Sequence, residues 1–485
     1  MTATSHHIRF ILDNQLVELD FQQSKNTRPS TTLLNYLRSL PSHKGVKEGC
    51  AEGDCGACTV VIAELNSNNE LEYKALDSCL VFLPMINGKQ IITVENLEQH
   101  IGKDIQLHPV QQLMVENNGS QCGYCTPGIV MSLFALYKNH HQPEKEVIVD
   151  SLTGNLCRCT GYKPIIEAAK QACIHHGKDH FSEKQQEVTL QLLNIKKDNT
   201  SILLYHPEQV YMLPQNLNDA LELKKQYPNA VLIAGASDTA LRQTKKGEII
   251  PQIIDLSQVE ELKNIEITEK SIIIGSAITL EKIKSAVEKP FPALFNILKV
   301  FGSLQIRNIA TMGGNIGSAS PIGDTLPFLI ACKALIKLQS SDSKRLIPIE
   351  DFIIGYRKTA IKTDELIVAI EIPFIHENLI LKSYKVSNRK DLDISTVSAC
   401  FRLQLDNNNE VEDIIIVYGG MAAQTLRAKQ TETFLSGKTW NKQTVEAAMG
   451  ILYNEFSPIS DARSDKEYRK LACGNLLVKF WDETK

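Results

Sequence analysis

The spacing of hydrophobic and polar residues divides the chain into regions of different period. Up to about residue 94 the pattern is typical of short strands, with apolar and polar residues alternating on either side of Asp13-Asn14 as in a β-hairpin. We therefore expect a small α+β domain over residues 1–92. Its predicted elements are a hairpin at 7–22, a short helix at 31–37, a strand at 59–65 and further strands at 72–83 and 90–94.

After residue 92 the pattern becomes helical. Prolines stand in the first turn of two predicted helices, at Pro109 and Pro127, and Thr126 is the expected N-cap of the second. We expect a four-helix bundle over residues 93–174. Residues 175–200 are polar and charge-rich, which is typical of a linker between domains. The predicted helices are 108–115, 129–137, 145–152 and 163–174.

The second half of the chain mixes both periods, so we expect an α+β domain at 201–378 and a last, α/β domain at 379–485. The predicted elements of the first are strands at 231–234, 272–274, 335–338 and 366–372 with helices at 217–226 and 280–287. The second carries a clear strand at 411–417 and a helical tail.

Composition narrows the possible functions. The 485 residues are 43% hydrophobic and 22% charged, which is ordinary for a globular protein of several domains. A net charge of −4 gives no reason to expect nucleic acid or an anionic membrane as partner. The sequence has no apolar run long enough to span a bilayer and no secretion signal at its N-terminus. We expect a cytoplasmic protein, in which thiols stay reduced and available as ligands.

Eight of the twelve cysteines fall in two groups before residue 160. The first group has the spacing C-x4-C-x2-C followed by a fourth cysteine, the pattern of plant-type [2Fe–2S] ferredoxins. Glycines at 49, 53 and 56 are expected to allow positive φ and to let backbone N–H groups point at the sulfides. Structural zinc favours short C-x2-C pairs and is a weaker match, as is a disulfide framework. The predicted ligands are Cys50, Cys55, Cys58 and Cys79.

The second group combines a C-x2-C pair with a C-x-C pair, a spacing that by itself leaves zinc open. Each pair precedes a predicted helix, whose first N–H groups favour anionic ligands. The predicted ligands are Cys122, Cys125, Cys157 and Cys159. The remaining cysteines, Cys173, Cys332, Cys400 and Cys473, are scattered and are expected to be small buried side chains.

The motifs resemble those of the molybdenum hydroxylases. QCGYCTPG (121–128) and GNLCRCTGY (154–162) are similar to the helical iron–sulfur domain of that family, and GCAEGDCGACTV (49–60) is similar to its ferredoxin-like domain. The whole chain resembles the iron–sulfur and flavin half of the xanthine dehydrogenase branch, which in many bacteria is a separate small subunit. The resemblance implies a β-grasp domain, a four-helix [2Fe–2S] bundle, a two-part α+β FAD-binding domain and a C-terminal domain, with two [2Fe–2S] clusters and FAD.

Two loops rich in small residues, 231–241 and 303–324, serve equally well as plain turns when taken alone. Small residues also let backbone N–H groups approach a pyrophosphate, and the resemblance implies that both loops bind FAD. Ala236 stands where the family often has glycine. The implied FAD contacts are Leu232, Ile233, Ala234, Gly235, Ala236, Ser237, Asp238, Thr239, Phe301, Thr311, Met312, Gly313, Gly314, Asn315, Asp324, Ile367 and Lys385.

The segment GYRKT (355–359) resembles the family segment that lies near the nicotinamide nucleotide, which makes Tyr356 a candidate NAD contact. The alternative for Tyr356 is a buried tyrosine whose hydroxyl is hydrogen-bonded.

Nothing after residue 201 resembles the molybdopterin-binding half of the family. We therefore expect no catalytic residue in this chain and an obligate large molybdopterin-binding subunit as partner, in a dimer of heterodimers. The resemblance implies xanthine dehydrogenase activity for the complex, with electrons passing through both clusters to FAD and then to NAD. Alternatives are another molybdenum hydroxylase acting on aldehydes, nicotinate or carbon monoxide, and a non-enzymatic, zinc-stabilised interaction module.

Overall fold

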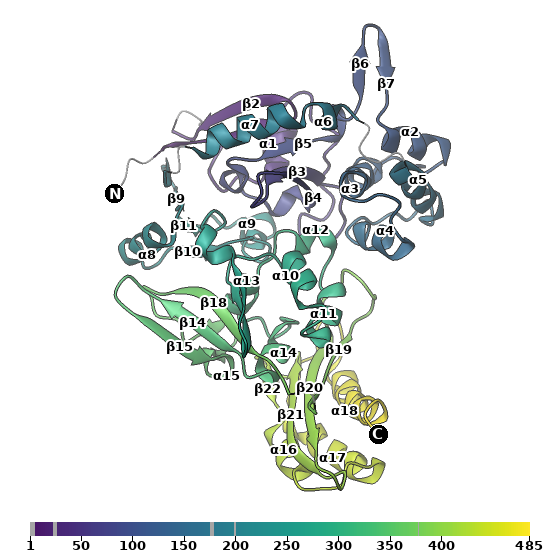
Figure 1. Cartoon of the computed structure of the whole chain (residues 1–485), viewed down its shortest axis with the longest axis vertical. Helices are drawn as coiled ribbons and strands as arrows, with labels where there is room; N and C mark the ends of the chain where they lie inside the picture. The colour runs from purple at the N-terminus through teal and green to yellow at the C-terminus, as the bar shows by residue number, and fades with distance from the viewer. Residues whose placement is uncertain (1–4, 23–26, 175–178, 198–199, 377) are drawn as a thin grey trace. The chain divides into compact units, whose positions relative to one another are not determined.

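A computed structural model describes residues 5–22, 27–174, 179–197, 200–376 and 378–485. The chain folds into two compact units (Figure 1). Unit 1 comprises Met1–Val259 with Ser303–Ala310, and unit 2 comprises Glu260–Gly302 with Thr311–Lys485. The expected multidomain α+β fold is confirmed. Among the described residues, none of the helices combines the length and the apolar character needed to cross a bilayer.

The N-terminal sheet of unit 1 has five strands in the order β2-β1-β5-β3-β4. The predicted hairpin is present, and Asp13 takes the positive φ of its turn. Helix α1 packs its leucines into the core below the sheet and is N-capped by Thr32. The predicted strand at 72–83 ends at Asp77, where the chain turns into a short 3-10 helix. The bounds are β1 His7–Leu12, β2 Gln15–Asp20, α1 Leu33–Ser39, β3 Thr59–Leu65, β4 Leu71–Asp77, η1 Ser78–Leu80, η2 Leu83–Ile86, β5 Gln90–Ile92 and η3 Val94–Asn96.

The helical region of unit 1 contains all four predicted helices. Helix α3 is buried along nearly its whole length because it packs on β3 and β4 as well as on the helices beside it. It begins at Thr126 with Cys125, rather than Thr126, as its N-cap. A hairpin of β6 and β7 that the sequence did not predict projects beside α2 (Figure 1). The bounds are β6 Gln99–Ile101, β7 Asp104–Gln106, α2 Pro109–Glu116, α3 Thr126–Asn139, α4 Lys145–Ser151 and α5 Lys163–Ile174.

Part of the predicted linker is helical: α6 spans His180–Glu183 and α7 spans Gln185–Lys196. Val188, Leu192 and Ile195 of α7 pack against Ile11 and Leu65 of the N-terminal sheet. The segment is therefore anchored on the sheet along α7. Positions 175–178 and 198–199 of the predicted linker lie outside the described residues.

A second, four-stranded sheet of unit 1 has the order β10-β11-β9-β8. It forms the first part of the predicted flavin domain. The short helix α12 belongs to the same unit, where the fully buried Arg307 forms an ion pair with Asp150 of α4 at 2.7 Å. The bounds are β8 Ile202–His206, β9 Gln209–Leu213, α8 Leu217–Gln226, β10 Val231–Ile233, α9 Ala240–Thr244, β11 Gln252–Asp255 and α12 Leu304–Arg307.

Unit 2 holds the second part of the predicted flavin domain, a five-stranded sheet in the order β12-β13-β18-β14-β15. Its central strand β18 is antiparallel to both β13 and β14. The bounds are η4 Glu260–Lys263, β12 Ile265–Ile267, β13 Ser271–Gly275, α10 Leu280–Val287, α11 Pro292–Lys299, α13 Met312–Gly317, α14 Leu326–Ala331, β14 Leu335–Gln339, β15 Lys344–Pro348, α15 Ile349–Phe352, β16 Ile353–Gly355, β17 Lys358–Thr359 and β18 Leu366–Pro373.

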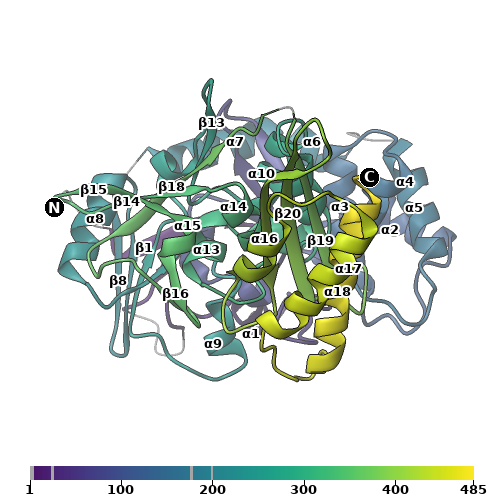
Figure 2. The same ribbon diagram turned by 90° about the horizontal axis from the view of Figure 1, so that it is seen from below.

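The C-terminal part of unit 2 is a four-stranded antiparallel sheet, β19-β20-β21-β22, with helices α16, α17 and α18 against one face (Figure 2). Alternate residues of β20, including Val397, Ala399 and Phe401, enter the core shared with Trp440 and Phe480. Helix α14 contacts β20 and β21. The bounds are β19 Ile380–Val386, β20 Val397–Leu405, β21 Val411–Gly419, β22 Leu426–Arg427, α16 Lys429–Leu435, α17 Lys442–Glu455 and α18 Lys466–Asp482.

Candidate functional site

The first cysteine group is assembled by the pairing of β3 with β4. Thr59 lies opposite Asp77 in this ladder, so Cys58, just before β3, comes next to the turn that follows β4 and carries Cys79. The Ser78 hydroxyl fixes this approach by donating to the Cys58 carbonyl at 2.6 Å. Cys58 and Cys79 are both buried, whereas Cys50 and Cys55 are partly exposed.

The four thiols of this group lie in two pairs. Cys55 donates a hydrogen bond to the sulfur of Cys50, and this bond, helped by the N–H groups of Glu52 and Asp54, lowers the pKa of Cys50 to about 5. The second pair is Cys58 with Cys79: the hydrogen bond between them and burial raise the pKa of Cys58 well above its usual value. The two sulfurs of each pair therefore lie next to each other.

The loop conformation matches the expectation in part. Gly53 and Gly56 take positive φ as predicted, at 81° and 67°. Gly49 does not; the third left-handed residue is Ala51. Gly49 is needed for space instead, because a Cβ there would lie 2.8 Å from the sulfur of Cys55.

The second cysteine group lies at the starts of α3 and α5 and also forms two pairs. Cys122 pairs with Cys159, and Cys125 pairs with Cys157. Burial opposes ionisation of Cys157, but hydrogen bonds from the Thr160 hydroxyl and N–H outweigh it and lower the pKa of Cys157. Cys122 and Cys159 are exposed, so one edge of this group is open to solvent within unit 1.

A buried polar network joins the two groups. The Leu156 N–H donates to the Cys55 carbonyl at 3.1 Å, which links a residue beside Cys157 directly to a residue of the first group. The Asn155 side chain donates to the Gly56 carbonyl and accepts from Gln305 of α12, at 3.1 and 3.0 Å. Cysteine spacing does not reveal Asn155 or Gln305, because a single amide in the sequence carries no signal of a partner far along the chain.

This arrangement fits a two-iron cluster at each group. A [2Fe–2S] cluster is held by four cysteine thiolates, two on each iron, and two pairs of sulfurs supply that donor set twice. Within the described residues, no three cysteine, histidine or acidic side chains converge closely enough to hold one metal ion. The pairwise placement of the thiols is the positive observation that favours clusters.

In unit 1, the predicted FAD loop turns sharply after β10. Gly235 approaches the backbone so closely that a Cβ there would lie 1.7 Å from the Ile309 carbonyl oxygen. Ala236 adopts φ 57°, the left-handed conformation in which glycine is the usual residue. The alanine that replaces the family's usual glycine at position 236 therefore keeps the turn, in a strained backbone conformation.

In unit 2, the second predicted loop also depends on small residues. Thr311 N-caps α13 and accepts from the Gly314 N–H at 3.1 Å. A Cβ on Gly313 would lie 2.6 Å from the carbonyl oxygen of Ser276. The buried hydroxyl of Ser276 has no hydrogen-bond partner in the described structure, which leaves it available to a bound polar group. No sequence signal distinguished this serine.

A buried ion pair stands among the other predicted flavin residues of unit 2. The Lys385 ammonium donates to Asp324 at 2.9 Å and to the Val300 carbonyl at 3.0 Å, and the Ser395 hydroxyl donates to the same carboxylate at 2.5 Å. The structure thus brings Asp324 and Lys385 together. Ile367 is buried near Gly317, Phe301 is half-buried, and Tyr356 is 61% exposed on the turn between β16 and β17. The buried-tyrosine alternative for Tyr356 is therefore wrong.

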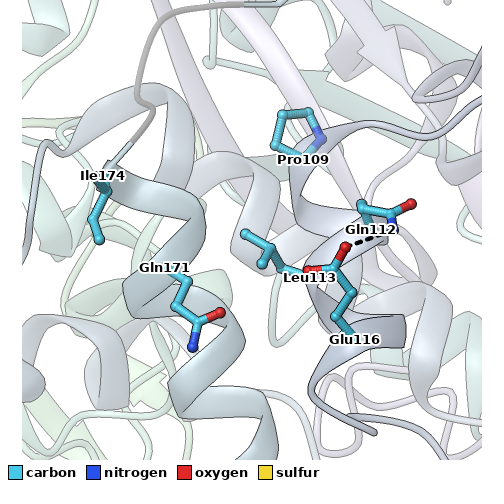
Figure 3. Close-up of a pocket in the computed structure, with 6 residues that line it drawn as sticks. All are labelled: Pro109, Gln112, Leu113, Glu116, Gln171 and Ile174. Atoms are coloured by element: carbon cyan, nitrogen blue, oxygen red, sulfur yellow. Dashed lines mark hydrogen bonds between the residues drawn. The ribbon is translucent and has the colours of Figure 1, made fainter.

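An open pocket of about 410 Å³ lies between α2 and α5 (Figure 3). Its wall is mostly apolar, and the visible polar contact is the hydrogen bond from Gln112 to Glu116 at 2.7 Å. No predicted site residue lines it. The lining residues are Pro109, Gln112, Leu113, Glu116, Gln171 and Ile174.

Three parts of the chain match known domain families. Residues 93–170 match a [2Fe-2S] binding domain, residues 205–375 the FAD binding domain in molybdopterin dehydrogenase, and residues 382–484 the CO dehydrogenase flavoprotein C-terminal domain. The chain belongs to the molybdenum hydroxylase family. It carries the electron-transfer domains of a molybdenum hydroxylase, one that binds [2Fe–2S] and one that binds FAD.

Full-length molybdenum hydroxylases match almost the whole chain. Xanthine dehydrogenase of Emericella nidulans is 34% identical over 93% of the chain and 36% of its own length. Xanthine dehydrogenase/oxidase of Gallus gallus is 30% identical over 94% and 39%, and aldehyde oxidase 3 of Rattus norvegicus 29% over 94% and 38%. The chain thus spans a little over a third of the length of these relatives.

Solved structures show the same fold for the flavin region. A chain of carbon monoxide dehydrogenase from Hydrogenophaga pseudoflava superposes with a TM-score of 0.54 at 24% identity, covering 57% of this chain and 96% of its own. A chain of quinoline 2-oxidoreductase from Pseudomonas putida gives 0.53 at 22%, covering 58% and 99%.

Proposed function

We propose that this chain is the electron-transfer subunit of a xanthine dehydrogenase. It would take electrons from a molybdopterin-binding subunit that hydroxylates hypoxanthine and xanthine, and deliver them to NAD. When bound, two [2Fe–2S] clusters would carry single electrons, and FAD would exchange single electrons with them and a pair with NAD. The observation that carries the proposal is the presence of two paired thiol groups in one compact unit, joined by the Leu156–Cys55 hydrogen bond.

The exposure of the thiols supports an order for the two groups. Cys58 and Cys79 are buried, whereas Cys122 and Cys159 are exposed beside the exposed side chains of Tyr124 and Leu156. Exposed apolar side chains at a redox group are typical of a protein–protein contact. We infer that the Cys122 group faces the molybdenum subunit and receives electrons first, and that the Cys50 group passes them on toward FAD.

The flavin residues of each unit have separate tasks in this proposal. In unit 1, the turn at Gly235 and Ala236 would present backbone N–H groups to the FAD diphosphate. In unit 2, the Gly313–Gly314 turn would do the same, and the Lys385–Asp324 pair would hold polar groups of the flavin. Tyr356, exposed on its turn, would contact NAD.

The proposal that the complex acts on purines is supported by the curated relatives. The xanthine dehydrogenases match nearly the whole chain, and so does an aldehyde oxidase at 29% identity. Aldehyde, nicotinate and carbon monoxide hydroxylases are therefore the alternatives within the class. The alternative from a different class is a zinc-stabilised interaction module without redox chemistry.

The deciding experiment is anaerobic purification of the chain with its native partners, followed by metal and flavin analysis and assay on xanthine, an aldehyde and nicotinate. We expect iron, FAD and a molybdopterin subunit in the complex, with the highest activity on xanthine. Activity confined to another substrate would replace the purine assignment, and a colourless protein containing zinc would replace the redox assignment.

The NAD contact has its own test. The purified chain loaded with FAD should reduce an artificial dye with NADH, and Tyr356→Ala should raise the KM for NADH at least fivefold. Tyr453→Ala, which changes another exposed tyrosine, is the matched control and should leave that KM unchanged. An unchanged KM in the Tyr356 variant would remove the assignment.

A further inference from the structure

Each cysteine loop of unit 1 has a lysine ammonium bound to its backbone. At the first loop, Lys245 donates to the carbonyl oxygen of Cys50 at 3.0 Å. At the second loop, Lys47 donates to the carbonyl oxygens of Gly123 and Tyr124 at 3.2 and 3.3 Å. Lys47 lies in the irregular segment just before the first loop, so it reaches across from one cysteine group to the other.

The two lysines differ in charge balance. Lys245 forms an ion pair with Glu52 at 3.2 Å, so its charge is compensated beside the first loop. In the part of the chain that the structure describes, Lys47 forms no ion pair. Its ammonium lies 5.3 Å from the centre of the Tyr124 ring, and the Tyr124 hydroxyl donates to the Glu48 carbonyl at 2.5 Å. These contacts hold an uncompensated positive charge against the loop between Cys122 and Cys125.

Lys47 is also connected to a cluster ligand through one peptide group. Its ammonium binds the carbonyl oxygen of Gly123, and the N–H of the same peptide, on Tyr124, donates to the sulfur of Cys122. A cation on the carbonyl end of a peptide polarises that peptide and strengthens the hydrogen bond made by its N–H. Lys245 binds the Cys50 carbonyl and is paired with Glu52, so its effect on the first group is smaller.

We propose that Lys47 raises the reduction potential of the cluster held by Cys122, Cys125, Cys157 and Cys159, and so favours the entry of electrons into this chain. The inference rests on the proposed function, since it requires a cluster at these thiols. Reduction adds negative charge to a cluster, so a nearby cation and a stronger N–H···S bond both stabilise the reduced form. Lys47 is a positioning residue, because it touches the cluster loop and acts through it.

The test uses the holoprotein and redox titration followed by electron paramagnetic resonance. The signal of the second cluster is identified as the one that Cys159→Ser alters. In Lys47→Gln we expect its midpoint potential to fall, shifting the electron equilibrium between the clusters about threefold to tenfold toward the first; a tenfold shift equals about 59 mV for one electron. Lys47→Arg keeps the positive charge, so the electron equilibrium between the clusters should stay within twofold of the wild-type value.

The matched control removes the compensated pair at the other loop. The double variant Lys245→Gln with Glu52→Gln removes no net charge. It should therefore leave the electron equilibrium between the two clusters within twofold of the wild-type value. Absence of any [2Fe–2S] signal in the wild-type chain would overturn the proposed function itself. Normal signals with an unchanged second potential in Lys47→Gln would overturn only the role of Lys47.

A structural role for Lys47 gives a different result. If Lys47→Gln and Lys47→Met both lose the second signal while Lys47→Arg keeps it, the lysine serves to hold the loop and the inference is overturned. If Lys47→Gln or Lys47→Met keeps its iron, the midpoint potential of the second cluster decides. A lower potential supports the inference, and an unchanged or higher potential overturns it.

Discussion

The backbone N–H of Leu156 lies 3.1 Å from the carbonyl oxygen of Cys55, to which it donates a hydrogen bond. This bond joins two loops that are about a hundred positions apart in the sequence and belong to separate cysteine groups. Beside it, Asn155 donates to the Gly56 carbonyl and to the Thr59 hydroxyl, both at 3.1 Å. The two thiol groups are thus held in one fixed arrangement by the backbone as well as by side chains.

Replacing Asn155 should weaken this arrangement. Asn155→Ala removes one of the donors to the Gly56 carbonyl and leaves the buried Ser132 hydroxyl without the acceptor that it now has at 2.6 Å, which costs about 1–3 kcal/mol. We expect a lower urea midpoint for the loss of visible absorption from the holoprotein. Asn68→Ala, at an exposed turn, is the control and should not change that midpoint. Equal midpoints for the two variants would contradict the account of the network.

The grouping of the thiols could be predicted from the sequence because cysteine spacing constrains which thiols share a loop, and their role as cluster ligands stays a prediction. The pairing within each group could not be predicted. Cys58 lies next to Cys79 because of the register of β3 with β4. Cys122 lies next to Cys159 because the segments that precede α3 and α5 come together. Lys47, Asn155 and Gln305 act through contacts between distant segments, which a single sequence does not reveal.

The loop after β10 offers two neighbouring substitutions with opposite outcomes. Gly235→Ala would place a methyl group 1.7 Å from the Ile309 carbonyl oxygen and should strongly destabilise unit 1 and lower its FAD content. Ala236→Gly should stabilise the chain by about 1 kcal/mol, because it relieves the left-handed conformation of an alanine. Thermal midpoints and flavin content of the two variants test this; a stabilising Gly235→Ala would contradict the geometry.

Breaking the Lys385–Asp324 pair should reduce flavin binding. Lys385→Met leaves the Asp324 carboxylate buried without its cation, a loss of about 3–5 kcal/mol. We expect a lower thermal midpoint and less FAD per chain after purification. Lys382→Ala is the control on the same strand: its ion pair with Glu483 is exposed and contributes at most about 1 kcal/mol. Full FAD content in Lys385→Met would contradict the role of the pair.

A buried cluster that anchors the start of α6 should make unit 1 sensitive to acid. His108 accepts the Val110 N–H and contacts Asp179 at 3.2 Å, and Lys138 pairs with the same carboxylate at 2.9 Å. Burial lowers the pKa of His108. Burial alone would raise the pKa of Asp179, but hydrogen bonds from His108 and the charge of Lys138 lower it below its usual range.

The pKa shifts of His108 and Asp179 both make the folded state less stable as the pH falls. The unfolded histidine takes up a proton below about pH 6.5 while the folded one resists, so stability falls as the pH drops from 7 toward 5. The contribution of Asp179 is present above about pH 4 and is lost below it. We expect thermal midpoints to fall between pH 7 and pH 5 less steeply in His108→Asn, which keeps a helix-capping side chain. Parallel pH curves for variant and wild type would contradict this.

The helix α7 shows why the linker prediction was incomplete. The buried residues of α7 are Val188, Leu192 and Ile195, which pack on the sheet with the partly buried Leu193, in a segment otherwise rich in glutamine and charge. Their i, i+4, i+7 spacing is the helical signal that was present, but polar composition outweighed it. The β6–β7 hairpin was missed because its strands are short and exposed, so burial imposed no pattern on their sequence.

The central claim is that two groups of paired thiols each hold a two-iron cluster, and metal analysis with electron paramagnetic resonance of anaerobically purified protein tests it most directly. We expect about four irons per chain and two distinct [2Fe–2S] signals. Cys79→Ser should remove one signal and Cys159→Ser alter the other, while Cys173→Ala, at a buried cysteine outside both groups, should keep both. Stoichiometric zinc, or no iron at these cysteines, would contradict the account.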